Sequence, residues 1–437
     1  MTDARPGLRH RATRRRLAGA AARGAFALVL SILLAAAWVA WRNVERALPP
    51  PAVVAAGGQE SPGQEPDGAY LARAANCVGC HTAPGGAILA GGRAIATPFG
   101  TVFSRNLTPH AQHGLGGWTA DDLARALQHG RSRDGRLLTP ACPFPDFARL
   151  ERRDIDALHR HLQAMPAVAQ PNRAHELRWP YGLQVAQAVW RALYVDPRPL
   201  AAEPGKDAAW HRGRYLVEVL GHCGACHRER DAFGGVASER RGGLVSSPPW
   251  LAPSLHSTRQ AGVASWSEDE IVALLQTGVS PRGSTLGPMA DVVFRSTQHL
   301  STGDLQAMAR YLRTLPPLDD PAAVAPPAAP AVLAAGRRLY EAHCEDCHGE
   351  AGQGEPGAYP PLAGNRAVML DDPRNLIQVL RHGGFTPTTA GQPRPWGMPP
   401  FVGVLDAAEM AAVATYVRQS WGHAASEVTP LDVLRTP

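Results

Sequence analysis

Three copies of the pattern Cys-x-x-Cys-His are the residues of this chain whose types and spacing indicate a chemistry most directly. They are Cys77, Cys80 and His81; Cys223, Cys226 and His227; and Cys344, Cys347 and His348. Two thiols separated by two residues can form thioether bonds to the vinyl groups of one haem, while the adjacent imidazole reaches its iron. Six of the seven cysteines fall in these patterns, so zinc sites and redox dithiols are the weaker alternatives. We therefore expect three covalently bound haem c groups.

A methionine that could be the second iron ligand follows the second and the third motif. Met289 lies 62 residues after His227, and Met398 lies 50 residues after His348. Met369 competes for the third site, but we favour Met398 because prolines beside it stiffen the loop that must hold a weak thioether ligand over iron. We expect His/Met ligation at both of these haems.

Cys142 stands at the corresponding position of the first unit, 61 residues after His81. A thiolate is a stronger donor than a thioether and stabilises ferric iron, so His/Cys ligation would lower the potential of this haem relative to the other two. Two alternatives stay open. The iron is five-coordinate beside a small buried cysteine, or it binds one of the histidines at positions 110, 113 and 129.

Helices are expected to position these ligands in each unit. Residues 68–81, 210–227 and 335–348 are expected to run as short helices into the attachment motifs. Middle helices begin near Thr119 and Ser267, each three residues before a carboxylate that can complete a capping box, and end near Gly130 and Gly278. The third middle helix is expected at residues 375–382, the amphipathic closing helices at 155–162, 305–312 and 407–421, and an additional helix at 179–194.

This pattern predicts an all-α fold with three tandem class I cytochrome c domains behind an N-terminal membrane segment. The expected order is a basic segment at residues 1–24, an apolar helix at 25–41, a linker at 42–66, a first domain at 67–200, a second at 201–315, a Pro/Ala linker at 316–330, a third domain at 331–425 and a C-terminal tail at 426–437.

The charge of the chain is concentrated at its N-terminus. Seven arginines and one aspartate in residues 1–24 account for the whole formal charge of +6, so a nucleic-acid-binding surface is unsupported. The apolar run that follows is typical of an export signal or of a short uncleaved anchor. We favour the anchor because Trp38 and Trp41 suit a membrane interface. The body is then expected on the periplasmic side of the cytoplasmic membrane.

Residues 67–425 resemble the trihaem cytochrome c subunit of membrane-bound periplasmic dehydrogenases, which serves alcohol, gluconate, sorbitol and aldehyde dehydrogenases. The resemblance is carried by Asn106-Leu-Thr-Pro109, the proline-rich loop 140–147, Gly287-Pro-Met289 and Met398-Pro-Pro-Phe401. The family has methionine where this chain has Cys142, which leaves the ligation of the first haem in question.

The resemblance implies electron transfer from a catalytic subunit that carries flavin, pyrroloquinoline quinone or a molybdenum cofactor, to ubiquinone or a terminal oxidase. The sequence itself contains no Gly-x-Gly-x-x-Gly motif and no nucleophile constellation outside the expected haems, so no catalytic residue is assigned. Two other hypotheses are a haem enzyme, peroxidase-like or sulfur-oxidising, with an open first haem, and a tethered carrier without a fixed partner. The substrate of the partner is not encoded in this chain.

Overall fold

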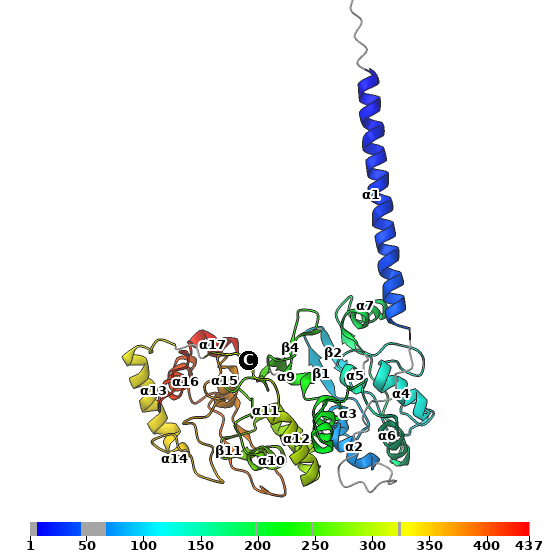
Figure 1. Ribbon diagram of the computed structural model, residues 1–437. Coiled ribbons are helices and arrows are strands. Elements are labelled where there is room, and N and C mark those ends of the chain that lie inside the picture. The colour runs from blue at the N-terminus through cyan, green and yellow to red at the C-terminus, as the bar shows by residue number, and fades with distance from the viewer. Residues whose placement is uncertain (1–6, 45–66, 197–198, 246–248, 322–324, 437) are drawn as a thin grey trace, which may run out of the picture.

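The structure, a computed structural model, describes residues 7–44, 67–196, 199–245, 249–321 and 325–436. A long helix, α1 (Gly7–Arg42), rises from one end of a body in which three units lie side by side (Figure 1). We use the name unit for the described residues of each segment that holds one Cys-x-x-Cys-His motif: those of 67–200 (first unit) lie beneath α1, those of 201–315 (second unit) are central, and those of 331–425 (third unit) form the far end. The predicted linker at 42–66 lies outside the described residues from position 45 onward.

Helices form most of the ordered structure in every unit. The first unit contains α2 (Gly68–Ala74), α3 (Cys77–His81), α4 (Ala120–His129), α5 (Phe144–Phe147), α6 (Arg152–Ala164) and α7 (Gln184–Tyr194). The second contains α8 (Ala208–Tyr215), the π-helical turn η1 (Leu216–Leu220), α9 (Gly224–His227), α10 (Glu268–Thr277), α11 (Gly287–Arg295), the 3-10 turn η2 (Thr297–His299) and α12 (Thr302–Arg313). The third contains α13 (Pro330–His343), α14 (Glu345–His348), α15 (Arg374–His382) and α16 (Ala407–Gln419), and is followed by α17 (Pro430–Arg435).

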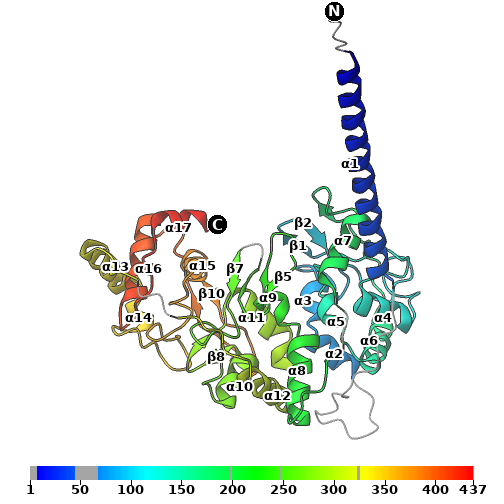
Figure 2. The ribbon, with the colours of Figure 1, turned by 45° about the horizontal axis from the view of Figure 1, so that its top comes forward.

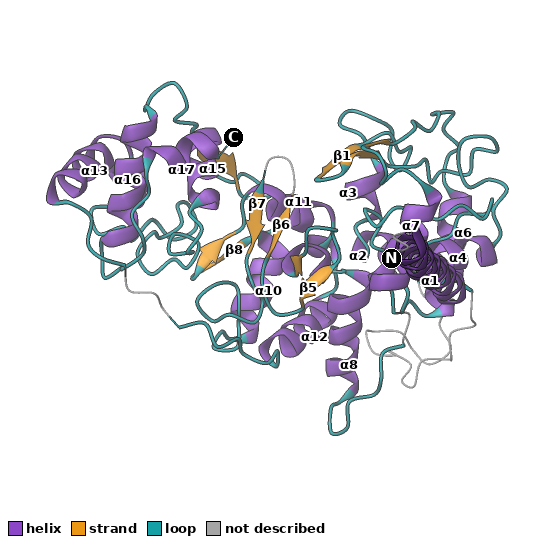
Figure 3. Ribbon diagram, turned by 90° about the horizontal axis from the view of Figure 1, so that it is seen from above, coloured by secondary structure: helices purple, strands orange, loops and turns teal. Residues whose placement is uncertain are grey.

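Short antiparallel strands are also present, which departs from the all-α expectation (Figure 3). A three-stranded sheet is formed by β1 (Ala94–Thr97), β2 (Gly100–Phe103) and β3 (Glu176–Leu177). Two-stranded pairs are β4 (Glu229–Arg230) with β5 (Val236–Ser238), β6 (Gly243–Val245) with β7 (Trp250–Ala252), β8 (Val279–Ser280) with β9 (Gly283–Ser284), and β10 (Gly384–Phe385) with β11 (Gly397–Met398). The strands lie in Gly/Pro-rich loop segments. Their pairing provides hydrogen bonds for backbone N–H and C=O groups that are not part of a helix.

The middle helices begin and end as the sequence predicts. At the start of α4, Thr119 accepts a hydrogen bond from the backbone of Asp122, whose carboxylate accepts one in return. Ser267 and Glu270 form the same capping box on α10. Both helices stop at a glycine in the left-handed conformation, which a residue with a side chain rarely adopts.

The helices that lead into the attachment motifs are interrupted, contrary to the prediction of continuous helices. In the first unit, α2 ends before α3 begins, and Asn76 between them has φ of 49°, a left-handed conformation that asparagine tolerates better than most residues. In the second unit, η1 and a left-handed His222 separate α8 from α9. The attachment turn is thus a separate element that can face the haem independently of the helix before it.

Each unit is built on the same close crossing of its first and last helices. At three glycines an added Cβ would overlap a carbonyl oxygen of the closing helix; the pairs are Gly68 with Ala157, Gly213 with Ala307, and Gly336 with Ala412. The side chain four residues after each alanine also covers the glycine, namely His161, Tyr311 and Tyr416. Only glycine permits two helices to approach this closely. The same backbone contact between the first and last helix therefore occurs in all three units.

The first two units share one hydrophobic core, while the third has its own. The shared core joins α2 and α6 to α8 and α12, and the third core lies around α13, α15 and α16. Residues 426–437, predicted as a tail, include α17, which packs on α16 with Val428 and Val433 buried. The sequence pattern does not predict this helix because a segment of one or two turns is too short to show helical periodicity.

An approximate twofold symmetry relates the first two units across this shared core. The hydroxyl of Tyr70 donates to Asp304, and the hydroxyl of Tyr215 donates to Asp154, each at 2.6 Å. Each tyrosine lies two residues after its crossing glycine, and each aspartate lies three residues before its crossing alanine. Each tyrosine oxygen also accepts a backbone N–H 3.1 Å away, from the residue three positions before the aspartate.

The two halves of this interface differ in charge. Asp304 receives two hydrogen bonds from the buried Arg212, at 2.9 and 2.8 Å. Burial opposes the charge of Arg212, but the contacts with Asp304 raise its pKa above the ordinary arginine value. The position equivalent to Arg212 in the first unit is Asp67. The arginine of the first unit near Asp154 is Arg153, at the longer distance of 3.8 Å, and burial raises the pKa of Asp154 to about 6.

Candidate functional site

The histidines of the three motifs share one hydrogen-bond geometry. Their Nδ1 atoms lie 2.7 Å from the carbonyl oxygen of Arg105, 2.7 Å from that of Pro253 and 3.1 Å from that of Pro360, for His81, His227 and His348 respectively. A carbonyl can only accept, so Nδ1 carries the proton and Nε2 keeps its lone pair. A backbone carbonyl in this position orients an imidazole that ligates a metal through its other nitrogen.

Burial lowers the pKa of all three histidines. Desolvation is the main cause in each case, and the carbonyl hydrogen bond only partly opposes it. The rings are therefore held neutral, which is the form that binds iron.

One continuous cavity of about 540 Å³ serves the second and third motifs together. Its lining includes all the motif residues of both units except the two spacer residues of each, and also Met289 and Met398, the predicted distal ligands. The competitor Met369 is not among the lining residues in the described part of the chain. Most of the lining is apolar, as expected of a cofactor pocket that excludes water.

A polar cradle beside Trp266 fits the carboxylate groups of a haem. The indole Nε1 of Trp266 is buried and has no hydrogen-bond partner among the described residues. Arg282 and Arg366 each lie with their guanidinium carbon 5.7 Å from the centre of its ring, and all three residues line the cavity. Arg282 also pairs with Glu270 at 2.9 Å, and Arg366 donates to the carbonyl of Gly262 at 2.6 Å. The unpaired indole N–H near these two arginines is a donor that an anionic propionate could use.

A second pair of cations lies beside the first motif. Burial, and then the neighbouring Arg136, lower the pKa of Arg105, the residue whose carbonyl orients His81. Burial and the same two arginines lower the pKa of His175 to about 4. The carboxylate of Asp134 pairs with Arg136 at 3.7 Å and partly compensates this positive charge.

Cys142 lies with the attachment cysteines of the first site. Burial raises the pKa of Cys142 to about 12, with a further contribution from Cys80. Burial also raises the pKa of Cys77 to about 12, with contributions from Cys80 and Cys142. The Cys142 thiol thus interacts electrostatically with the attachment thiols of the first motif, and burial disfavours its thiolate form.

The alternative histidines have other contacts. His110 and His113 stack with ring centroids 5.1 Å apart, and Nδ1 of His110 accepts the backbone N–H of His113 at 3.2 Å. His129 is the last residue of α4, and its carbonyl accepts a hydrogen bond from Arg191. These contacts stabilise the loop and the helix end to which the histidines belong.

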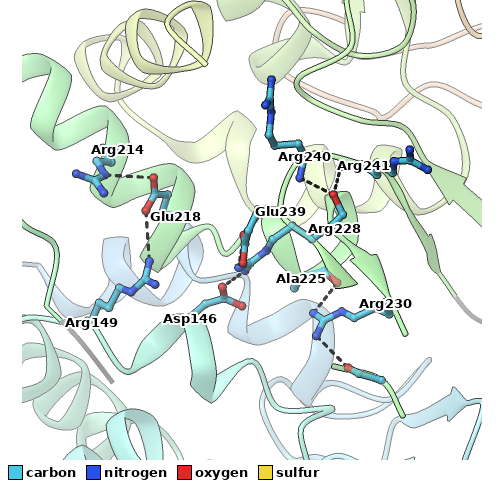
Figure 4. Close-up of polar contacts among 12 residues, drawn as sticks. Asp146, Arg149, Arg214, Glu218, Ala225, Arg228, Arg230, Glu239, Arg240 and Arg241 are labelled. Carbon is cyan, nitrogen blue, oxygen red and sulfur yellow. Dashed lines mark hydrogen bonds and ion pairs between the residues drawn. The ribbon is translucent and has the colours of Figure 1, made fainter. Parts of the chain in front are cut away.

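The loop that carries Cys142 is attached to the second motif (Figure 4). Asp146 forms an ion pair with Arg228, which follows His227 directly and also contacts Glu239 at 3.1 Å. The ring of Phe147 meets that of His222 edge-on, with centroids 5.2 Å apart. Sequence reasoning missed this link, as it missed Arg282 and Arg366; an arginine directly after a motif histidine was the one signal that could have pointed to it.

Helix α11 connects the three sites. It carries Met289, it contacts α3 of the first site, and it contacts β10, which pairs with the strand that carries Met398. Its Asp291 also lies 3.9 Å from Arg93 of the first unit. Between the first and second sites, the Cys80 thiol contributes to the raised pKa of Cys226, after burial. The sites are thus neighbours in the order first, second, third.

Comparison with known proteins gives a consistent result. The family model described as Cytochrome c matches residues 333–421. The chain is 36% identical over 389 residues to the alcohol dehydrogenase (quinone) cytochrome c subunit of Gluconacetobacter polyoxogenes, covering 84% of this chain and 83% of the relative. It is 35% identical to the gluconate 2-dehydrogenase cytochrome c subunit of Pantoea cypripedii (84% and 88%) and 31% identical to the fructose dehydrogenase cytochrome subunit of Gluconobacter japonicus (83% and 80%).

Proposed function

Because the chain belongs to the family of cytochrome c subunits of dehydrogenase complexes, we propose that it conducts electrons through three covalently bound haem c groups. The observation that carries the number three is the common geometry of the motif histidines, each with Nδ1 at a backbone carbonyl. A haem c bound at such a site supplies one-electron chemistry at its iron. The protein would hold the imidazoles neutral, exclude water from the haem sites and position the residues that bind the haem carboxylates.

The distal ligands in this proposal are Met289 at the second site, Met398 at the third and Cys142 at the first. The two methionines are supported by their place in the common cavity. Cys142 is supported by its electrostatic interaction with the attachment thiols and by its spacing from His81, which closely matches that of Met289 from His227. The six motif cysteines form the thioethers, and the domains are those expected at residues 67–200, 201–315 and 331–425.

We further propose that α1 remains attached to the mature protein as a membrane anchor. Residues Ala20–Arg42 are long and apolar enough to span a bilayer, and 23 residues rise about 35 Å against a hydrocarbon core of about 30 Å. Arg42 and Asn43, at the end of this helix, bond to the body of the protein. The arginines at residues 1–24 favour a cytoplasmic N-terminus and hence a body on the periplasmic side.

The partner in this proposal is a dehydrogenase catalytic subunit of the flavin, pyrroloquinoline quinone or molybdenum type, and the acceptor is ubiquinone or a terminal oxidase. Support comes from the named relatives, which are subunits of alcohol, gluconate and fructose dehydrogenases. The competing proposal of a haem enzyme requires an open first site. The electrostatic interaction of the buried Cys142 with Cys80 favours a closed one.

The test is isolation of the full chain from native membranes in mild detergent. We expect three haems per chain by pyridine haemochrome assay and a stoichiometric catalytic subunit identified by mass spectrometry. A count of one or two haems contradicts the trihaem proposal. Recovery of the cytochrome alone, with a high-spin ferric haem that binds cyanide, would instead favour the haem enzyme.

A further inference from the structure

Helix α7 is fixed to the point where α1 meets the body. Arg42 donates through Nε to the carbonyl of Ala192 at 3.1 Å and through Nη2 to that of Val195 at 3.0 Å. Asn43 donates to the carbonyl of Ala188 at 2.9 Å. Arg42 thus caps the C-terminal end of α7, where the carbonyl of Ala192 has no partner within the helix, and Asn43 binds the middle of α7. Figures 1 and 2 show α7 beside the lower end of α1.

One face of α7 is apolar and exposed. Val185, Val189 and Leu193 are 73%, 39% and 57% exposed, and they follow one another at intervals of four residues. The opposite face carries the buried Gln187 and Arg191, which bond to the body. At a helical period of 100° per residue, the centres of these two faces lie on opposite sides of the helix.

The segment before α7 extends the apolar surface. Trp179 is 83% exposed and Leu183 is 49% exposed. Tryptophan is enriched where protein meets the polar surface of a bilayer. The cation of Arg178 directly precedes Trp179, which suits the anionic headgroups found there.

The depth of α7 along the anchor also fits a bilayer surface. Asn43, which bonds to the middle of α7, follows Trp41 by two residues, a rise of about 3 Å along a helix. Trp38 and Trp41 are exposed at this end of the candidate span, where an interfacial belt is expected. The apolar face of α7 therefore begins at the level where the span ends.

We propose that the exposed face of α7, together with Trp179 and Leu183, lies in the lipid interface beside α1. The occupant is lipid because the surface is continuous with the end of a membrane span to which it is hydrogen-bonded. Burying such a face in the interface removes apolar area from water. Attachment at two places would restrict rotation of the body about α1 and keep the first unit against the membrane. This proposal rests on the retained anchor.

The test places a photoreactive benzoylphenylalanine at Val189 of the full chain in native membranes. After irradiation, mass spectrometry identifies what is attached. The same substitution at Leu34 within α1 is the positive control, and Val404, which is 59% exposed in the third unit, is the matched negative control. We expect phospholipid adducts at positions 189 and 34 and at most a tenth of that yield at position 404.

Four results would overturn the proposal. A discrete protein adduct at position 189 would make α7 a subunit interface. Lipid adducts at position 34 without any at 189, or equal yields at 189 and 404, would remove α7 from the bilayer while leaving the anchor intact. An intact mass that lacks α1 would refute the retained anchor itself, so this failure is distinguishable from the failure of α7 alone.

Discussion

The first site is the one for which we propose a cysteine, Cys142, where the other two have a methionine as distal ligand. Its histidine has the same carbonyl partner geometry as the other two, so any difference in potential must come from the distal side and from nearby charge. Cys142, the distal ligand that we propose, interacts electrostatically with the attachment cysteines. A sulfur ligand that carries a negative charge stabilises the ferric state more than a thioether does.

Replacing Cys142 with methionine should therefore raise the midpoint potential of the first haem. We expect a shift on the order of 0.2 V, within the span of about 0.8 V that axial ligands cover. Spectroelectrochemical titration of the purified protein would measure it, with the second and third haems unchanged as internal references.

The Cys142→Ala variant supplies the control for that experiment. If Cys142 ligates iron, alanine leaves an open site with a high-spin ferric spectrum and rapid carbon monoxide binding when reduced. Unchanged spectra in both variants would show that the cysteine is a packing residue and that another group holds the iron.

The third site offers a matched pair of methionines. Met398 lines the cavity, whereas Met369 belongs to the neighbouring turn and is not among the lining residues described. Met398→Ala should convert one of the three haems to a form that binds carbon monoxide, and Met369→Ala should not. Carbon monoxide difference spectra of the two variants give the answer, and the reverse pattern would reassign the ligand.

At the scale of elements, the crossing of the first and last helix determines how each haem unit is assembled. The glycine of α8 packs so closely on α12 that a Cβ at Gly213 would overlap the carbonyl of Ala307. A backbone carbonyl cannot move without displacing its helix. The first helix leads toward the attachment motif, so its position against the last helix also positions the thiols.

Gly213→Ala should lower the free energy of unfolding by about 1–3 kcal/mol, as overpacking of a buried contact does. Gly303→Ala, in the same unit, is the control because the space around Gly303 is open and α12 gains helix propensity. Thermal unfolding followed at the haem absorption band would compare them. Equal melting temperatures would contradict the close crossing.

At the scale of the whole molecule, the twofold interface between the first two units holds two sites in one rigid block. Its two tyrosine–aspartate pairs are geometrically equivalent but electrostatically different, since Arg212 compensates Asp304. Asp154 has a pKa of about 6, raised chiefly by burial, against about 3.9 in an unfolded chain. The folded state therefore binds more protons than the unfolded state between pH 4 and 6, and stability falls as the pH rises through this window.

Asp154→Asn should remove this pH dependence. At pH 7 the variant is expected to be more stable than the parent, by up to about 3 kcal/mol for a pKa difference of about two units, while at pH 4 the two should be alike. Melting temperatures measured from pH 4 to pH 8 test this.

Asp304→Asn changes the equivalent position and should have the opposite effect. Loss of this carboxylate leaves the buried Arg212 without its ionic partner, which costs about 3–5 kcal/mol. The loss should appear at every pH between 5 and 8. Parallel behaviour of the two variants would show that the electrostatic asymmetry of the interface is absent.

The sequence by itself determined the chemistry and the local elements. Covalent attachment needs two thiols and an imidazole at fixed short spacing, so the motifs can be recognised from the sequence without knowledge of the fold. The capping boxes at Thr119 and Ser267 and the glycines that end the same helices are also local signals, since a helix end is decided within a few residues.

Only the tertiary structure decided which distant residues meet. Several contacts join segments that lie 12 to 145 residues apart in the sequence. They are the hydrogen bonds of the motif histidines to backbone carbonyls, the approach of Arg366 from the third unit to the second site, the ion pair of Asp146 with Arg228, and the hydrogen bond of Asn43 to α7. No short-range pattern encodes such pairs, because they depend on how helices cross and how units pack. The physical reason is that thioether and capping chemistry act over one turn of backbone, whereas charge compensation and contact with a membrane act across the folded surface.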